Sequence, residues 1–103
     1  MKIVSVKKID AWYPRGKIEQ FALMANKNIP KPPSFMNNSM LEFGYSIRDG
    51  LRITIEVQVP GSVIPYHLKF AAEYFTKIFT YVKKMEQKAE KEFPGIKFFY
   101  EIV

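Results

Sequence analysis

Cysteine is absent from this chain of 103 residues, and histidine occurs only once, as His67. A chain without cysteine has no disulfide framework, no thiolate metal ligand and no cysteine nucleophile. A single histidine supplies neither a multi-histidine metal site nor a catalytic triad. These shortages exclude several common chemistries, and the lack of cysteine is compatible with a reducing compartment.

Long apolar runs are also absent, so the sequence predicts no signal peptide, no membrane span and no membrane partner. We expect a soluble, cytoplasmic protein. No serine lies in a nucleophile-elbow pattern, and the five glycines are isolated rather than gathered in a phosphate-binding loop. We therefore predict no catalytic residues, no metal ligands and no cofactor.

The acidic side chains provide no clear candidates for catalysis or metal binding. Asp49 is expected in a turn, and Asp10, near a strand end, is expected to be solvated or to cap a helix. Glu42 and Glu56 are offset by nearby arginines in a cross-strand charge pattern. The sequence thus predicts a protein that is not an enzyme.

Strict alternation surrounds Asp49-Gly50 and is the strongest pattern present. Apolar residues occupy every second position on both sides, namely Leu41, Phe43, Tyr45 and Ile47, then Leu51, Ile53, Ile55, Val57 and Val59. A strand sends successive side chains to opposite faces, so each run has one apolar and one polar face. Asp-Gly suits a type I′ turn, and the sequence predicts a β-hairpin.

Residues 2–12 read as a first strand, with a bulge at Lys7-Lys8 to restore its alternation. Residues 17–25 have two interpretations. They can follow a tight turn as a second strand. Alternatively they form a helix, which is favoured by good helix formers and by an apolar spacing of i, i+3, i+4 and i+7, the residues being Ile18, Phe21, Ala22 and Ala25.

Prolines dominate the loop predicted over residues 26–39, where Pro30, Pro32 and Pro33 exclude helix. A loop of this length in a small domain is usually functional or disordered. A long helix is predicted over 66–92, ending at Phe93-Pro94-Gly95, and a last strand over 96–103.

Apolar residues in the first half of that helix fan over an arc of roughly 200°, wider than one sheet contact requires. The surplus can pack against Phe35 and Met36 of the loop, against the other helix, or across a subunit interface. We predict self-association, as a dimer, through Phe70, Tyr74, Phe79 and Tyr81. The alternative is that the two tyrosines lie at the edge of the core with their hydroxyls in water.

The net charge of +6 is concentrated in residues 1–31, which hold seven basic and two acidic groups. Two aromatic rings adjoin two cations there, a combination that suits single-stranded nucleic acid, in which bases stack on rings and phosphates meet cations. The alternative for the rings is burial at a strand end. The predicted nucleic-acid-binding residues are Trp12, Tyr13, Arg15, Lys17, Lys27, Lys31 and Phe35.

In order, the elements predict one α+β domain over residues 1–103. It is a two-layer sandwich with an antiparallel four-stranded sheet in the βαββαβ order of a ferredoxin-like fold. If 17–25 is a strand, the domain becomes a five-stranded antiparallel sheet crossed by a single long helix. No family motif accompanies the order, because a glycine-rich acylphosphatase loop and a heavy-metal cysteine pair are both absent.

Three functions follow from these patterns. The first is a small basic binding or assembly protein, not an enzyme, that binds nucleic acid through its basic-aromatic N-terminal region. The second is a dimeric ferredoxin-like domain that holds a small ligand between sheet and helix, lined by tyrosines. The third is an accessory subunit or inhibitor of a larger complex, in which the loop 26–39 contacts a protein partner.

Overall fold

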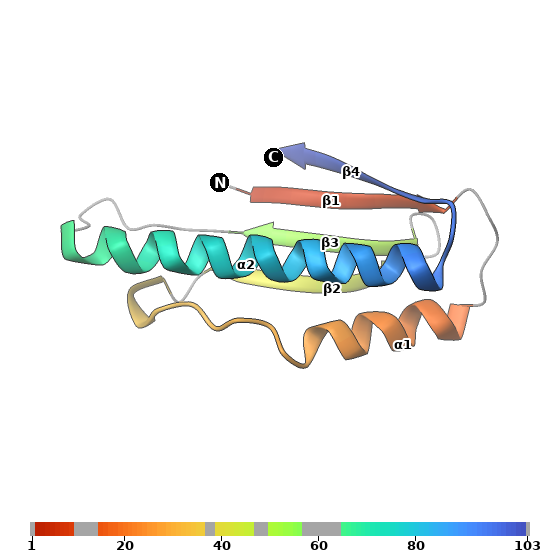
Figure 1. The fold of residues 1–103 in the computed structure, drawn as a ribbon, viewed down its shortest axis with the longest axis horizontal. Helices are drawn as coiled ribbons and strands as arrows, with labels where there is room; N and C mark the ends of the chain where they lie inside the picture. The colour runs from red at the N-terminus through yellow and green to blue at the C-terminus, as the bar shows by residue number, and fades with distance from the viewer. Residues whose placement is uncertain (1, 10–14, 37–38, 47–49, 57–64, 103) are drawn as a thin grey trace.

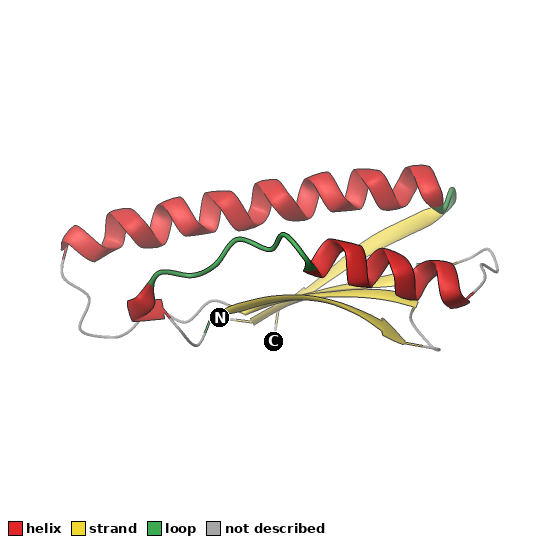
Figure 2. Cartoon of the chain, turned by 90° about the horizontal axis from the view of Figure 1, so that it is seen from below, coloured by secondary structure: helices red, strands yellow, loops and turns green. Residues whose placement is uncertain are grey.

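An antiparallel sheet of four strands lies beneath two helices (Figure 1). The computed structural model describes residues 2–9, 15–36, 39–46, 50–56 and 65–102. The sheet order is β2-β3-β1-β4, and both helices lie on the same side of the sheet (Figure 2). The elements along the chain are β1 (Lys2–Ile9), α1 (Arg15–Asn26), the 3₁₀ turn η1 (Ser34–Met36), β2 (Met40–Ser46), β3 (Gly50–Glu56), α2 (Pro65–Glu92) and β4 (Ile96–Ile102).

The predicted α+β class and the long helix are confirmed, since α2 spans Pro65–Glu92. It ends before Phe93-Pro94-Gly95, where Gly95 has a φ of 88° that favours glycine. Residues 17–25 lie within helix α1, so the five-stranded alternative is wrong. Helical periodicity decides the matter, because it buries all four apolar residues of the i, i+3, i+4, i+7 pattern on one face of α1, and a strand would divide them between two faces.

The hairpin is present as β2 and β3, but its register differs from the one that a type I′ turn at Asp49-Gly50 requires. A two-residue turn there would pair Arg48 with Leu51, whereas the strands pair Tyr45 with Leu51 and Phe43 with Ile53. The difference arises because directly opposite residues share a face of the sheet, and the apolar side chains of both strands must lie on the same face. The register of the two-residue turn would put apolar residues opposite polar ones, whereas the observed register puts apolar residues opposite one another. It leaves residues 47–49, outside the described part, between the paired strands.

On the side of β4, the first strand contains no bulge at Lys7-Lys8. Its pairing with β4 continues without interruption from Ile3↔Ile102 to Ile9↔Ile96, so the predicted bulge is absent from this pair of strands. The predicted extension to residue 12 lies outside the described residues. In Figure 1, α2 lies over β3 and β2 rather than over β1. Because α2 does not cover β1, this strand can carry polar residues on either face, and its broken alternation does not require a bulge.

Helix α2 is much longer than the strands beneath it. Its 28 residues extend about 42 Å, compared with about 23 Å for a seven-residue strand. The N-terminal half therefore projects past the sheet (Figure 1), and the Cα atoms span 48 × 24 × 17 Å. The loop after α1 lies beside this projecting half, where Met36 is only 1% exposed and the Phe35 ring stacks on His67 at 4.4 Å. The loop thus takes up part of the surplus apolar surface of α2.

Asn26, the last residue of α1, closes the outer edge of β2. Its side-chain amide donates to the Phe43 carbonyl at 2.7 Å, and its side-chain oxygen accepts from the Phe43 amide at 2.8 Å. These are the bonds that a neighbouring strand would make. An edge strand otherwise offers unpaired backbone groups to other chains, so Asn26 together with α1 blocks this edge against pairing.

We predict that Asn26→Ala lowers the free energy of unfolding by about 1–3 kcal/mol, because both Phe43 backbone groups lose their partner. Asn26→Asp keeps the acceptor but places a carboxylate against the Phe43 carbonyl, and is expected to be at least as destabilising. Urea denaturation measures both. The control Asn28→Ala alters an exposed asparagine two residues later, and equal effects at 26 and 28 would contradict the edge-closing role.

Candidate nucleic-acid interface

Four lysines form a row along one side of the C-terminal half of α2. These residues, the lysine row, are Lys77, Lys84, Lys88 and Lys91, and all four are exposed. At about 100° per residue they fall within an arc of roughly 60° on the helix surface. Three follow a seven-residue spacing, which returns to nearly the same face after two turns.

Acidic residues are segregated from this row. Within residues 77–91 the only carboxylates are Glu86 and Glu90. By helical geometry they lie about 130° or more around the axis from the centre of the row. Glu73 and Glu92 lie closer to the lysine row in angle around the helix axis, but they lie beyond its two ends along the helix. The row is therefore a continuous positive strip within a helix whose overall charge is nearly balanced.

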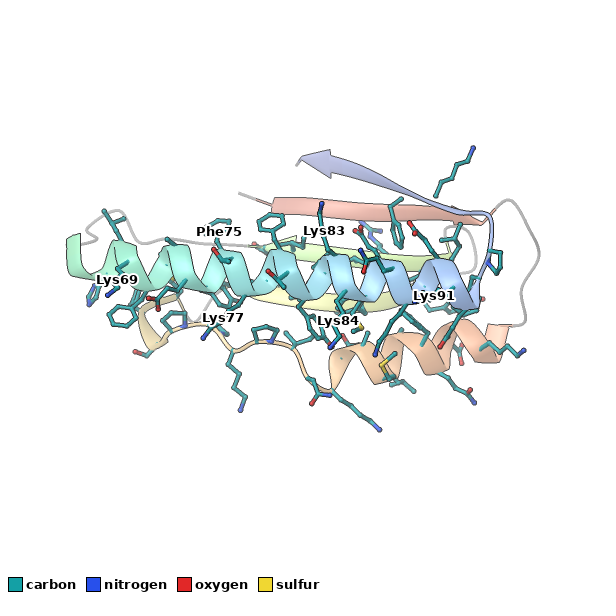
Figure 3. All side chains as sticks on the ribbon, viewed as in Figure 1. Lys69, Phe75, Lys77, Lys83, Lys84 and Lys91 are labelled. Atoms are coloured by element: carbon teal, nitrogen blue, oxygen red, sulfur yellow. The ribbon has the colours of Figure 1, made fainter. Side chains whose placement is uncertain are left out.

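Tyr81 shows where the row lies in the fold. The Tyr81 hydroxyl donates a hydrogen bond to the Ala25 carbonyl of α1, and its ring packs edge-on against Phe43 at 6.0 Å. Lys77 and Lys84 are one turn before and one turn after Tyr81, and so lie on the side of α2 that faces α1. Figure 3 shows both side chains directed toward the loop and α1, whereas Lys83 points toward β1.

Helix α1 runs beside the lysine row and adds two lysines. Exposed Lys17 lies near its start, and exposed Lys27 directly follows its end. An open hollow of about 420 Å³ separates the start of α1 from the end of α2, lined by Lys17, Gln20, Phe21, Met24, Glu92 and Phe93. The helical layer thus presents cations from both helices along their common boundary.

The predicted basic-aromatic cluster is only partly visible. Trp12 and Tyr13 lie outside the described residues, and Arg15 begins α1. Lys17, Lys27 and Lys31 are exposed but dispersed, since ten residues of helix, about 15 Å, separate the first two. Phe35 is stacked on His67, so its ring is already engaged within the chain.

The residues predicted for self-association occupy three different environments. Tyr74 is 3% exposed and belongs to the core, so its ring cannot form a surface for a second copy, which corrects that assignment. The Tyr81 hydroxyl is bonded to α1, and Phe70 is half-buried. Phe79 is 39% exposed and stacks on Phe75 at 6.1 Å. Of the four, Phe79 alone is exposed, and part of its ring is covered by Phe75.

The tyrosines expected to line a ligand pocket are dispersed as well. Tyr45 borders a hollow of about 280 Å³ between α1 and β2. Tyr74 and Tyr81 line neither this hollow nor the larger one at the end of α2. Among the described residues no group of three or more histidine, aspartate or glutamate side chains is arranged to hold a metal ion.

Sequence reasoning missed the lysine row because it counted charge by segment. Residues 65–103 hold seven basic and five acidic groups, so their net charge of +2 concealed how the signs are distributed around the helix. The seven-residue spacing of Lys77, Lys84 and Lys91 was the signal that could have revealed it.

The sequence matches no known family model, and comparison with curated proteins and with solved structures found no match either. In the part of the chain that the structure describes, neither helix is both long and apolar enough to cross a lipid bilayer.

Tyr74 and Tyr81 give a matched test of the helix packing. The buried Tyr74 hydroxyl has no hydrogen-bond partner among the described residues, whereas the Tyr81 hydroxyl is bonded. We predict that Tyr81→Phe lowers the free energy of unfolding by about 0.5–1.5 kcal/mol, while Tyr74→Phe leaves it unchanged or raises it. Thermal and urea denaturation compare the two variants, and equal destabilisation by both would contradict these environments.

The same residues predict weakening at high pH. Burial raises the pKa of the Tyr74 hydroxyl and that of the Tyr81 hydroxyl. Below about pH 10, the ordinary tyrosine value, both states keep these protons, and stability does not depend on them. Above it the unfolded state loses them first, so stability falls by up to about 1.4 kcal/mol per pH unit for each tyrosine until the folded pKa is reached. Urea titrations between about pH 9 and 11 should show a shallower decline for the double variant Tyr74→Phe/Tyr81→Phe, and an unchanged slope would refute the assignment.

Proposed function

We propose that this protein binds nucleic acid, without acting on it as an enzyme, through phosphate contacts made by the lysine row. The observation that supports the proposal is the segregation of charge on α2, where four exposed lysines share one side and the intervening glutamates lie on another. A surface of one sign attracts a polyanion and raises its rate of association. Exposed Lys17 and Lys27, near the two ends of α1, enlarge this surface.

The dimensions of the row suit a polymer better than a small anion. The fourteen helical steps from Lys77 to Lys91 extend about 21 Å along the helix axis. A nucleic-acid strand presents phosphates repeatedly over such a distance, so each lysine meets a charge without any particular base sequence. The proposed binding is therefore independent of sequence and strongly dependent on salt.

We also propose that the architecture is the ferredoxin-like sandwich. The sheet order β2-β3-β1-β4, its antiparallel pairing and the position of both helices on one side support this assignment. The polar face of the β2-β3 hairpin then lies opposite the helical layer. The proposed contact with nucleic acid uses the helices, whereas sheet-based RNA readers use exposed aromatic residues on strands.

We predict that the affinity for a short single strand falls with salt along a log–log slope of about −2.8, which is 0.7 for each of four phosphates. Lys84→Gln/Lys88→Gln removes two contacts and should reduce the slope to about −1.4, with a loss of affinity of about tenfold or more in low salt. Fluorescence anisotropy over a salt series measures both quantities. Duplex DNA, for which the slope for four contacts is about −3.6, shows whether strand flexibility contributes.

The control variant is Lys69→Gln/Lys83→Gln. It lowers the net charge by the same two units but removes one lysine before the row and one directed toward β1 (Figure 3). Its slope should match that of the wild-type protein. Failure of the wild-type protein to bind at low salt would overturn the proposed function, and equal losses in both variants would remove the lysine row from it.

A further inference from the structure

Strand β4 forms the second edge of the sheet, and this edge differs from the first. The β2 edge is closed by α1 and by the two hydrogen bonds of Asn26. At the other end of the order β2-β3-β1-β4, none of the described segments lies beyond β4 (Figure 1). An edge of this kind presents unpaired backbone amides and carbonyls, which are a template for another strand.

The sequence of β4 is chemically symmetric about its middle residue. The strand reads Ile-Lys-Phe-Phe-Tyr-Glu-Ile, with Phe99 at the centre. Two antiparallel copies centred on Phe99 would place Ile96 opposite Ile102, Lys97 opposite Glu101, and Phe98 opposite Tyr100. By the two-fold symmetry of the pair, each of these matches occurs twice. A shift of two residues in either direction removes both lysine–glutamate matches, so charge selects the centred register.

The pairing of β1 with β4 also leaves the positive charge of Lys97 without an opposite charge at the facing position of β1. In the register of β1 with β4, Lys97 lies directly opposite Lys8. Like charges at directly opposite positions destabilise a pair of strands, whereas opposite charges stabilise it. Lys97 is exposed, and a glutamate position on its other side would balance the two lysine positions in that row.

We propose that two copies of this protein associate through β4, antiparallel and centred on Phe99, to form one continuous sheet. The strand order across the dimer is β2-β3-β1-β4 followed by the same order reversed in the second copy. Seven paired positions supply about six to eight backbone hydrogen bonds. The two-fold axis is perpendicular to the sheet, so the helices of both copies lie on the same side and both lysine rows face the same way.

This interface is independent of the proposed nucleic-acid binding, because no residue of the lysine row takes part in it. It also differs from association through the long helix, since Phe79 and the other residues of α2 remain outside the pairing. The dimer is thus defined by a charge pattern that can be inverted experimentally.

Charge exchange tests the register. Lys97→Glu and Glu101→Lys each place like charges opposite one another twice per dimer, and each should raise the dimer dissociation constant about tenfold or more. The double variant Lys97→Glu/Glu101→Lys restores opposite charges and should dimerise as the wild-type protein does. An equimolar mixture of the two single variants should form a heterodimer, because every charged position then faces its opposite.

Sedimentation velocity over concentrations up to the millimolar range measures these equilibria, and circular dichroism checks that each variant is folded. Lys83→Glu is the control for the change in net charge, and it should leave the dimer unchanged. A wild-type protein that stays monomeric throughout would overturn the proposal. So would a dimer that tolerates both single variants, or that responds to Lys83→Glu as strongly as to Lys97→Glu.

Discussion

The apolar face of strand β3 must be kept from water, and most of this architecture depends on that requirement. β3 pairs with β2 on one side and with β1 on the other, and Leu51, Ile53 and Ile55 are at most 1% exposed. Their burial needs a long apolar stripe above them, which α2 provides with Ile78, Val82 and Met85 among its core residues. Burial of large side chains is the dominant favourable term in folding, and here it sets both the strand register and the position of the helix.

Different sides of helix α2 contact different parts of the protein or the solvent. One side enters the core, and another meets α1 through Tyr81. The side toward β1 carries the stacked rings of Phe75 and Phe79. Next to the α1 contact lies the lysine row, whose long side chains can extend into solvent while their stems remain near the protein. Packing and a candidate binding surface are thus combined in one helix.

Patterns of burial made the larger elements predictable. Alternation predicted the hairpin, and a broad apolar arc predicted the long helix. The hairpin register was not predictable from Asp49-Gly50, because the turn preference conflicts with the matching of faces and the buried faces determine the outcome. The supposed bulge at Lys7-Lys8 assumed that β1 needs an unbroken apolar face, a need that arises only where a helix covers the strand.

The candidate surface was harder to predict for a different reason. A count of charges along the chain directed attention to the N-terminal residues, whereas exposure and angular position around α2 reveal the lysine row. Likewise, the polar hydroxyl of Tyr74 suggests a position at the surface. Whether the side chain is buried depends on the elements that pack around it, which the local sequence does not reveal. Trp12 and Tyr13, which supply the two rings of the predicted basic-aromatic cluster, lie outside the described residues.

The unequal lengths of α2 and the sheet have a consequence for local stability. Residues in the second half of the helix rest on strands, so their backbone amides become available to solvent only when the domain unfolds. The projecting half has the loop and η1 for support, with Leu68 left 54% exposed. Free energies of local opening follow the amount of buried contact, so protection against hydrogen exchange should decrease toward the N-terminal end of a single uninterrupted helix.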